Sequence, residues 1–269
     1  TTSTDGVTWS AWSTITSGTG YRNVAIYVDY VNNKIYLSWN DGGGKHFFFK
    51  QGTLNANGSI TWGADETVAT ITETSSDRQN IWVDANGTVW IVGYGYNAET
   101  SEPWYLFKKP SGGTWSQVYK VNDSRPTQLS VFVLDNGKIV VVRTCDGFSG
   151  ADNYLNVWVS ADGGATWSLY TYYTYSILHH CAMIIGNIVH ISFIDKVNWD
   201  VYYIKFDGTT NTFGTAVKLH DDTSSIRTTI SKDKNNRIYV FFNRDSTAGA
   251  ILGYRRSDDG GATWSAETI

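Results

Sequence analysis

The sequence predicts an all-β protein made of repeated antiparallel sheets. Three observations lead to this expectation: hairpin patterns, a strand-and-turn composition and a long-period repeat. Alternating apolar residues flank short turns of Asn, Asp and Gly, which is typical of β-hairpins. Aromatic residues make up 15% of the chain, with 26 Gly and only 3 Pro, as expected for strands and turns around a sizeable core. Sustained helical periodicity is absent from the sequence.

The repeat ends each time in a Gly-rich turn followed by an aromatic residue. Its two sharpest copies, at 160–167 and 257–264, read SADGGATW and SDDGGATW. The aromatic residue recurs in steps of 53, 53, 52, 46 and 51 residues, at Trp9, Trp62, Trp115, Trp167, Phe213 and Trp264. A nearly constant period of this size is typical of repeat architectures.

Each repeat contains the pattern of four antiparallel strands. The predicted first hairpins are 24–29 with 34–39, 81–84 with 88–92, 129–135 with 138–142, 181–185 with 188–193, and 228–233 with 237–242. The predicted third strands are 46–50, 104–108, 154–159, 201–206 and 250–255, and a fourth strand begins at each Thr-Trp or Phe213. Four such strands repeated radially are typical of the blades of a β-propeller.

We therefore expect residues 1–269 to form a single β-propeller domain with five blades of four antiparallel strands. No linker interrupts the repeat, and closed all-β folds commonly reach this length as one unit. Residues 1–16 and 263–269 both have the pattern of a fourth strand, which predicts an extra N-terminal strand at the closure of the ring. Six blades are the alternative, and the redundant strand also suggests a part of a larger chain.

Charge and composition exclude several classes of partner. The net charge of −4 gives no general attraction to phosphate backbones, so nucleic acid is not expected as a partner. No apolar run approaches the ~18 residues that a membrane helix needs. Cys145 and Cys181 are too few for a disulfide framework, and Cys and His lack the spacing of a zinc site. We expect neither a metal nor a cofactor.

The Gly-rich turns resemble Asp-boxes, the bacterial neuraminidase (BNR) repeats of sialidase-like β-propellers. The aspartate and tryptophan of the three best copies are Asp5 and Trp9, Asp162 and Trp167, and Asp259 and Trp264. The motif has a structural logic, because Asp can accept turn N–H groups, Gly adopts the left-handed conformation, and Trp can wedge between neighbouring sheets. In the resembled family these turns lie on the face away from the ligand site.

In up-and-down sheets, the loops opposite these turns share the other face. The loops that enter the inner strands carry a cation or potential cation in every repeat, namely Arg22, Arg78, Arg125, His180 and Arg227. The loops that follow the second strands carry acids and aromatic residues, namely Trp39, Asp41, Tyr94, Tyr96, Asp146, Asp195, Trp199 and Asp245. We expect these side chains to converge near the axis of the propeller.

Such a ring suits an acidic sugar. Arginines can hold a carboxylate by bidentate hydrogen bonds, and an Asp with a raised pKa can act as general acid at a glycosidic oxygen. The resemblance implies an arginine triad, for which Arg22, Arg78, Arg125 and Arg227 are the candidates, and an acid, for which Asp41 and Asp146 are the candidates. The sequence departs from the family in two respects: only 124–126 approaches an Arg-Ile-Pro motif, and no clear Tyr–Glu nucleophile pair stands out.

Three functions stay open on the sequence alone. The first is a glycoside hydrolase acting on an acidic glycan, and the second is a polysaccharide lyase that uses His180 with Tyr173 and Tyr175. The third is a non-catalytic lectin, receptor-binding or structural module, in which aromatic residues stack on sugar rings. A catalytic site predicts one deep axial pocket, whereas a lectin predicts repeated, aromatic-floored sites between blades. The family resemblance implies an extracellular, cell-surface or virion location.

Overall fold

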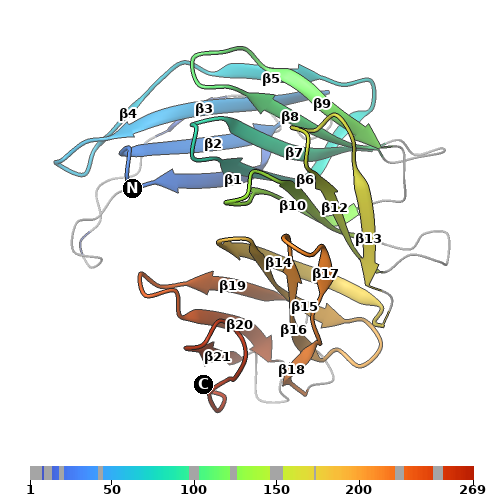
Figure 1. Ribbon diagram of the computed structural model, residues 1–269. Coiled ribbons are helices and arrows are strands. Elements are labelled where there is room, and N and C mark those ends of the chain that lie inside the picture. The colour runs from blue at the N-terminus through green and yellow to red at the C-terminus, as the bar shows by residue number, and fades with distance from the viewer. Residues whose placement is uncertain are drawn as a thin grey trace. The chain divides into compact units, whose positions relative to one another are not determined.

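The computed structural model describes residues 8, 14–17, 21–41, 45–96, 103–121, 126–145, 154–172, 174–221, 227–244 and 251–269. These residues form five antiparallel sheets, and no helix occurs among them (Figure 1). The prediction of an all-β fold with one sheet per repeat is therefore confirmed. Contacts divide the chain into two compact units, residues 1–123 and 124–269. The prediction of a single domain stays a prediction.

The first unit holds two sheets. Sheet 1 consists of β1 (Arg22–Asp29), β2 (Lys34–Asn40), β3 (His46–Leu54) and β4 (Ile60–Trp62) in that order, with β5 (Glu66–Thr70) also pairing with β3. Sheet 2 consists of β6 (Thr74–Val83), β7 (Val89–Tyr96), β8 (Trp104–Lys109) and β9 (Ser116–Val121). Each sheet is thus an up-and-down meander, as expected for a propeller blade.

The second unit holds three sheets. Sheet 3 consists of β10 (Pro126–Val133), β11 (Ile139–Cys145), β12 (Leu155–Ser160) and β13 (Ser168–Tyr172). Sheet 4 consists of β14 (Ile177–Ile185), β15 (Ile188–Asp195), β16 (Val201–Asp207) and β17 (Thr212–Phe213), with β18 (Val217–His220) also pairing with β16. Sheet 5 consists of β19 (Thr228–Lys232), β20 (Ile238–Arg244) and β21 (Ile251–Ser257).

All five predicted hairpins form, and their turn residues explain why. One residue of each turn has a positive φ, namely Asn33 (52°), Gly87 (74°), Gly137 (81°), Gly186 (61°) and Asn236 (59°). Gly and Asn tolerate this left-handed conformation, which tight hairpin turns require. The main difference is in β6, which begins at Thr74 rather than at residue 81. A register shift between Ser75 and Gln79 lets this polar stretch pair without apolar alternation.

The outer strands follow the prediction less closely. β9 and β13 begin directly after Trp115 and Trp167, as expected. The outer strands of sheets 1 and 4 are instead split, into β4 and β5 and into β17 and β18, and β4 ends at Trp62 rather than beginning there. The predicted fourth strand at 263–269 makes only an isolated bridge between Tyr254 and Thr268, so sheet 5 has three strands. The predicted extra N-terminal strand lies outside the described residues, apart from Thr8 and 14–16.

The cores lie between neighbouring sheets of each unit. In the first unit, Phe47, Ile91 and Phe107 are buried between sheets 1 and 2. In the second unit, the core between sheets 4 and 5 includes Val201 and Phe242. The second strands β2 and β15 are buried at nearly every position, so alternation of apolar and polar residues is weak in them.

The turn tryptophans complete these cores. The Trp115 ring meets Phe49 of β3 edge-on, with ring centroids 5.1 Å apart and an interplanar angle of 69°. Trp264 meets Tyr203 of β16 in the same way, at 4.8 Å and 65°. In both units the tryptophan therefore contacts the third strand of the preceding sheet. This is the packing between neighbouring sheets that the sequence predicts for the turn tryptophans.

Candidate functional site

The two Gly-rich turns of the second unit are closed by carboxylates. Asp162 accepts hydrogen bonds from the Thr166 amide at 2.9 Å, from the Thr166 hydroxyl at 2.6 Å and from the Ser160 hydroxyl at 2.8 Å. Asp259 accepts the equivalent bonds from Thr263 and Ser257 at 2.9, 2.5 and 2.8 Å.

These bonds hold the pKa of both carboxyls well below the usual range. Asp162 and Asp259 therefore serve as anionic caps of the turns. Asp5 and Trp9, which we assign to a further copy, lie outside the described residues.

The predicted axial ring draws on residues of both units, and much of it lies outside the described part of the chain. Arg125, Asp146 and Asp245 are not among the described residues, and the same holds for the side chains of Arg22, Arg78 and Tyr96. The convergence of the ring on one axis therefore stays a prediction. The remaining candidates can be placed within their own sheets.

In the first unit, the three described candidates lie at the end of sheets 1 and 2 opposite the hairpin turns. The Asp41 carboxylate lies 2.7 Å from Nδ1 of His46 and accepts the His46 amide at 3.2 Å, so it closes the connection from β2 to β3. Trp39 is 2% exposed, and its ring stacks on Phe48 with centroids 5.7 Å apart. Tyr94 is equally buried. Both rings would have to be uncovered before they could stack on a sugar.

In the second unit, Asp195 closes a turn. We call the end of a sheet where its second and third strands connect the loop end, and the end with the first hairpin turn the turn end. At the loop end of sheet 4, the Asp195 carboxylate accepts hydrogen bonds from the amides of Val197 and Asn198, both at 3.2 Å, and from Asn198 Nδ2 at 2.8 Å. Trp199 follows with a φ of 65° and is half-buried.

His180 lies on the inner strand β14 and Arg227 directly precedes the inner strand β19, and their exposure differs. His180 is fully buried, and its Nδ1 lies 3.0 Å from the Thr144 hydroxyl, which links β14 to β11. Arg227 is exposed just before β19, and its amide donates to the Asn243 side chain at 2.7 Å. His180 would have to become exposed before it could contact a substrate.

A cluster at the loop end of sheet 4 combines aromatic rings with an ion pair. We define the Tyr175 cluster as Tyr175, Phe193, Asp200, Tyr202 and Lys218. The ring of Tyr175 lies 4.4 Å from that of Tyr202 and 5.7 Å from that of Phe193, centroid to centroid. Asp200 is 2% exposed, and its Oδ2 lies 2.6 Å from the Lys218 ammonium.

The charges of the Tyr175 cluster are stabilised by their neighbours. The Asp200 carboxylate raises the pKa of Lys218, and burial together with Tyr175 raises the pKa of Tyr202. Phe193, Asp200 and Tyr202 are buried, whereas Tyr175 is half-buried and Lys218 is exposed. The Tyr175 ring and the Lys218 ammonium are therefore the groups that could contact the apolar face and the hydroxyl groups of a sugar.

Of this cluster the sequence indicates only Tyr175, through its nearness to His180. A further signal was present, because Asp200 directly follows Trp199 in the loop after β15. Within the described ranges, no group of three or more His, Cys, Asp or Glu could hold a metal ion. The same residues contain no helix that is long and apolar enough to cross a membrane.

Comparisons with known proteins find structural likeness only. No family model matches the chain, and no curated protein matches it. A protein of unknown function from Dyadobacter fermentans DSM 18053 is similar in structure, with a TM-score of 0.61 and 12% identity over 91% of this chain and 82% of that one.

Two fungal enzymes are also similar. The Penicillium chrysogenum α-L-arabinanase complexed with arabinobiose has a TM-score of 0.53 at 12% identity, covering 70% of this chain and 65% of that one. A mutant of the Fusarium graminearum α-L-arabinofuranosidase, complexed with an iminosugar inhibitor, has a TM-score of 0.53 at 14% identity, covering 68% and 62%. The chain thus spans slightly less than two thirds of each enzyme.

At such low identity these likenesses show the fold alone. Together with the five antiparallel sheets they give the fold class: an all-β β-propeller whose sheets fit five blades. The fold-class prediction is therefore confirmed. The two named enzymes are an arabinanase and an arabinofuranosidase, not sialidases. The comparisons therefore support the propeller fold but not the sialidase resemblance.

Proposed function

We propose that this protein binds a carbohydrate at the loop ends of its sheets, with the Tyr175 cluster as part of the site. The observation that carries the proposal is the Tyr175 ring, which lies tilted against Tyr202 with centroids 4.4 Å apart, beside the Asp200–Lys218 ion pair. Aromatic faces with a few convergent polar groups are the usual composition of sites for small organic ligands.

Two further observations support a carbohydrate. The two fungal enzymes with a similar fold are named for action on arabinose-containing substrates, and both are complexed with a sugar or a sugar mimic. The Gly-rich turns resemble those of sialidase-like propellers, and Asp162 and Asp259 close them as structural caps. In the resembled family the ligand site lies on the face opposite these turns.

We further propose that the glycan is acidic. Arg22, Arg78, Arg125 and Arg227 enter the inner strands of four repeats, and guanidinium groups are suited to bidentate carboxylate binding. An extracellular, cell-surface or virion location fits such a ligand. A hydrolase would use Asp41 or Asp146 as the acid, whereas a lectin needs neither residue.

A lyase receives less support from the structure. His180 would be its base, but the ring is fully buried and bonded to Thr144. Tyr173 lies outside the described residues. The choice is therefore mainly between a hydrolase and a binding module.

Binding and turnover can be tested separately. We expect a glycan array to show binding of acidic glycans, and Tyr175→Ala to weaken the best ligand roughly five- to tenfold in calorimetry, because one aromatic contact is worth about 1 kcal/mol beyond burial. Tyr30→Ala is the matched control, since Tyr30 is 81% exposed in the first unit. A silent array, or equal affinity in both variants, would overturn the proposal.

Fluorogenic sialosides and arabinofuranosides then separate the two classes. Hydrolysis that is lost in Asp41→Asn or Asp146→Asn identifies a glycosidase. Binding without hydrolysis of either substrate identifies a lectin.

A further inference from the structure

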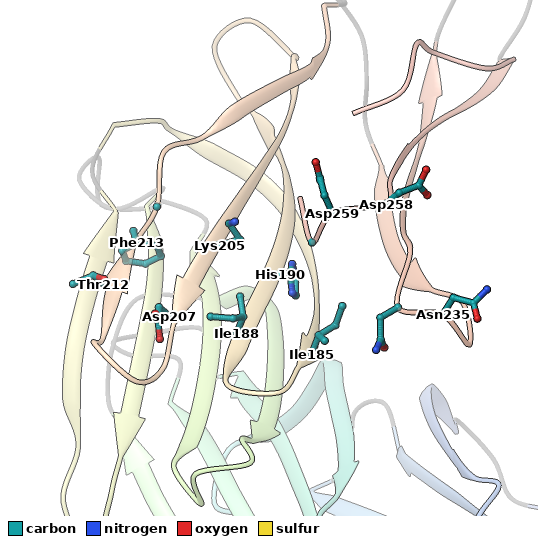
Figure 2. Close-up of a pocket in the computed structure, with 13 residues that line it drawn as sticks. Ile185, Ile188, His190, Lys205, Asp207, Thr212, Phe213, Asn235, Asp258 and Asp259 are labelled. Carbon is teal, nitrogen blue, oxygen red and sulfur yellow. The ribbon is translucent and has the colours of Figure 1, made fainter. Parts of the chain in front are cut away.

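A second candidate site lies at the turn end of the second unit, away from the loop ends. A pocket of about 560 Å³ opens between sheets 4 and 5. Figure 2 shows His190 and Lys205 from sheet 4 on one wall, and Asn235 and Asp258 from sheet 5 on the facing wall. Its volume lies within the range of about 300–1,000 Å³ that is usual for small-molecule sites.

His190 supplies a neutral imidazole to this pocket. The ring is 3% exposed, and its Nδ1 lies 2.6 Å from the Tyr203 hydroxyl. Burial, together with the charges of Lys205 and Lys232, lowers the pKa of His190 to about 4. Since Tyr203 occupies Nδ1, Nε2 is the ring nitrogen left to hydrogen-bond a ligand in the pocket.

Lys205 supplies a cation. It is the direct cross-strand partner of His190, so both side chains project from the same face of sheet 4. No hydrogen bond or ion pair joins its ammonium to any residue that the structure describes.

The carboxylates of the pocket wall are already engaged elsewhere. Asp207 accepts the Thr209 amide at 2.7 Å, Asp258 accepts from Arg256 Nη2 at 2.9 Å, and Asp259 caps its own turn. Among the residues that the structure describes, Lys205 is thus a pocket cation without a counter-ion.

The corresponding pocket of the first unit provides a contrast. It has a volume of about 640 Å³ and lies at the turn end between sheets 1 and 2. Both of its lysines are paired, Lys34 with the Thr53 hydroxyl at 2.8 Å and Lys109 with Glu66 at 2.6 Å. The position of Lys205 is taken there by Gln51, the cross-strand partner of Tyr36. A groove at this place is common to both units, but the unpaired cation and the imidazole are found in the second.

The remaining walls define the shape of a ligand. Ile185, Ile188 and Phe213 are apolar, whereas the side chains of Asn235 and Asn236 offer amide donors and acceptors. We propose that this pocket binds a carboxylated sugar ring, a uronic acid unit, with its carboxylate on Lys205 and its hydroxyls on His190 and the two asparagines. This site is independent of the one at the loop ends.

Glucuronate, glucose and acetate are the probes, because glucose lacks the charge and acetate lacks the ring. On the ¹⁵N-labelled wild-type protein, we expect glucuronate to shift the amide signals of Asn235, Asn236 and Gly260, and to leave Ala85–Gly87 of the first unit unchanged. Glucose and acetate should each bind at least tenfold more weakly than glucuronate. No shifts at Asn235–Asn236, or equal binding of acetate, overturns the proposal without any mutation.

Two lysine variants then test whether Lys205 is the cation that binds the carboxylate of glucuronate. Lys205→Gln should weaken glucuronate about tenfold or more, while Lys34→Gln, the matched lysine of the first unit, should leave it unchanged. Tyr175→Ala should also leave it unchanged, so failure of the loop-end site and failure of this one are distinguishable. Unchanged affinity in a folded Lys205→Gln protein, with its wild-type amide spectrum retained, contradicts the assignment.

Discussion

The indole of Trp264 meets the phenol ring of Tyr203 edge-on, with the ring centroids 4.8 Å apart. The first unit repeats the relationship with Trp115 and Phe49 at 5.1 Å. In each case a Gly-rich turn is attached to the sheet before it by one aromatic contact. Edge-to-face pairs add about 0.5–1.5 kcal/mol to the burial of the rings themselves. The turns therefore contribute to packing between sheets as well as to local chain reversal.

Trp264→Ala should remove this contact and part of the core between sheets 4 and 5. We expect the free energy of unfolding of the second unit to fall by about 3 kcal/mol, measured by urea denaturation. Tyr30→Ala removes an aromatic ring that is 81% exposed and should change stability by less than about 0.5 kcal/mol. Comparable losses in the two variants would show that Trp264 does not act as a wedge.

Gly261→Ala tests the close approach between the same turn and Tyr203. Gly261 has a φ of 86°, and a Cβ atom there would lie 2.1 Å from the Tyr203 hydroxyl oxygen. Gly260 has a φ of 69° but open space around its Cα, so Gly260→Ala isolates the backbone strain. We expect a loss of about 1–2 kcal/mol for Gly260→Ala and a clearly larger loss for Gly261→Ala. Equal melting temperatures would contradict the steric argument.

Acid should weaken the carboxylate-capped turns. Hydrogen bonds from Thr166 and Ser160 hold the pKa of Asp162 well below its usual range, and those from Thr263 and Ser257 do so for Asp259. A lowered folded-state pKa stabilises the fold above the unfolded value of about 4, and this stability is lost as the pH falls through the folded value. We expect the urea midpoint of the wild type to fall as the pH drops below about 4.

The Asp162→Asn, Asp259→Asn double variant provides the comparison. It should be less stable than the wild type at pH 7. It should also lose less stability on acidification, because the two Asn side chains do not take up the protons that Asp162 and Asp259 bind in acid. Parallel pH profiles of the two proteins would show that other carboxyls dominate the acid response.

Glu73 gives a second pH-dependent prediction, in the first unit. Burial alone would raise its pKa, but hydrogen bonds from the Tyr105 hydroxyl and Lys120 lower the pKa of Glu73 to about 2. The stabilisation is complete above the unfolded pKa of about 4.3 and is lost as the pH falls toward 2.

Thermal unfolding at several pH values tests this prediction. Glu73→Gln should lower the melting temperature at pH 7, and the difference from the wild type should shrink toward pH 2. Tyr105→Phe removes one donor and so raises the folded-state pKa of Glu73, and the acid-dependent loss of stability should be smaller and end at a higher pH. A Glu73→Gln difference that is independent of pH would contradict the assignment.

The hairpins could be predicted because their determinants are local. Asn33, Gly87 and Gly137 adopt the left-handed turn conformation that their residue types favour, and alternation marks the strands on either side. The outer strands could not be placed equally well, since pairing there depends on neighbours outside the repeat. Residues 263–269, for example, form one bridge, between Tyr254 and Thr268, in place of the predicted strand.

The candidate sites were less predictable than the fold. Trp39 near the end of β2 and Trp199 in the loop after β15 both follow a second strand, so they look alike in sequence, although Trp39 is buried and Trp199 is half-buried. His190 and Lys205 did leave a signal, as isolated polar residues within the apolar runs of β15 and β16. Their direct pairing across the two strands becomes visible only once the register is known.

Each tryptophan wedge packs against the sheet that precedes it in the chain, so one repeat needs the next repeat to complete its packing. Trp264 covers Tyr203 of the sheet that precedes it in the chain, and Trp115 covers Phe49 likewise. Truncation from the C-terminal side would thus strip an aromatic cover from the last surviving sheet. Truncation from the N-terminal side would instead leave a tryptophan without its target, so the two kinds of shortened protein should fail in different ways.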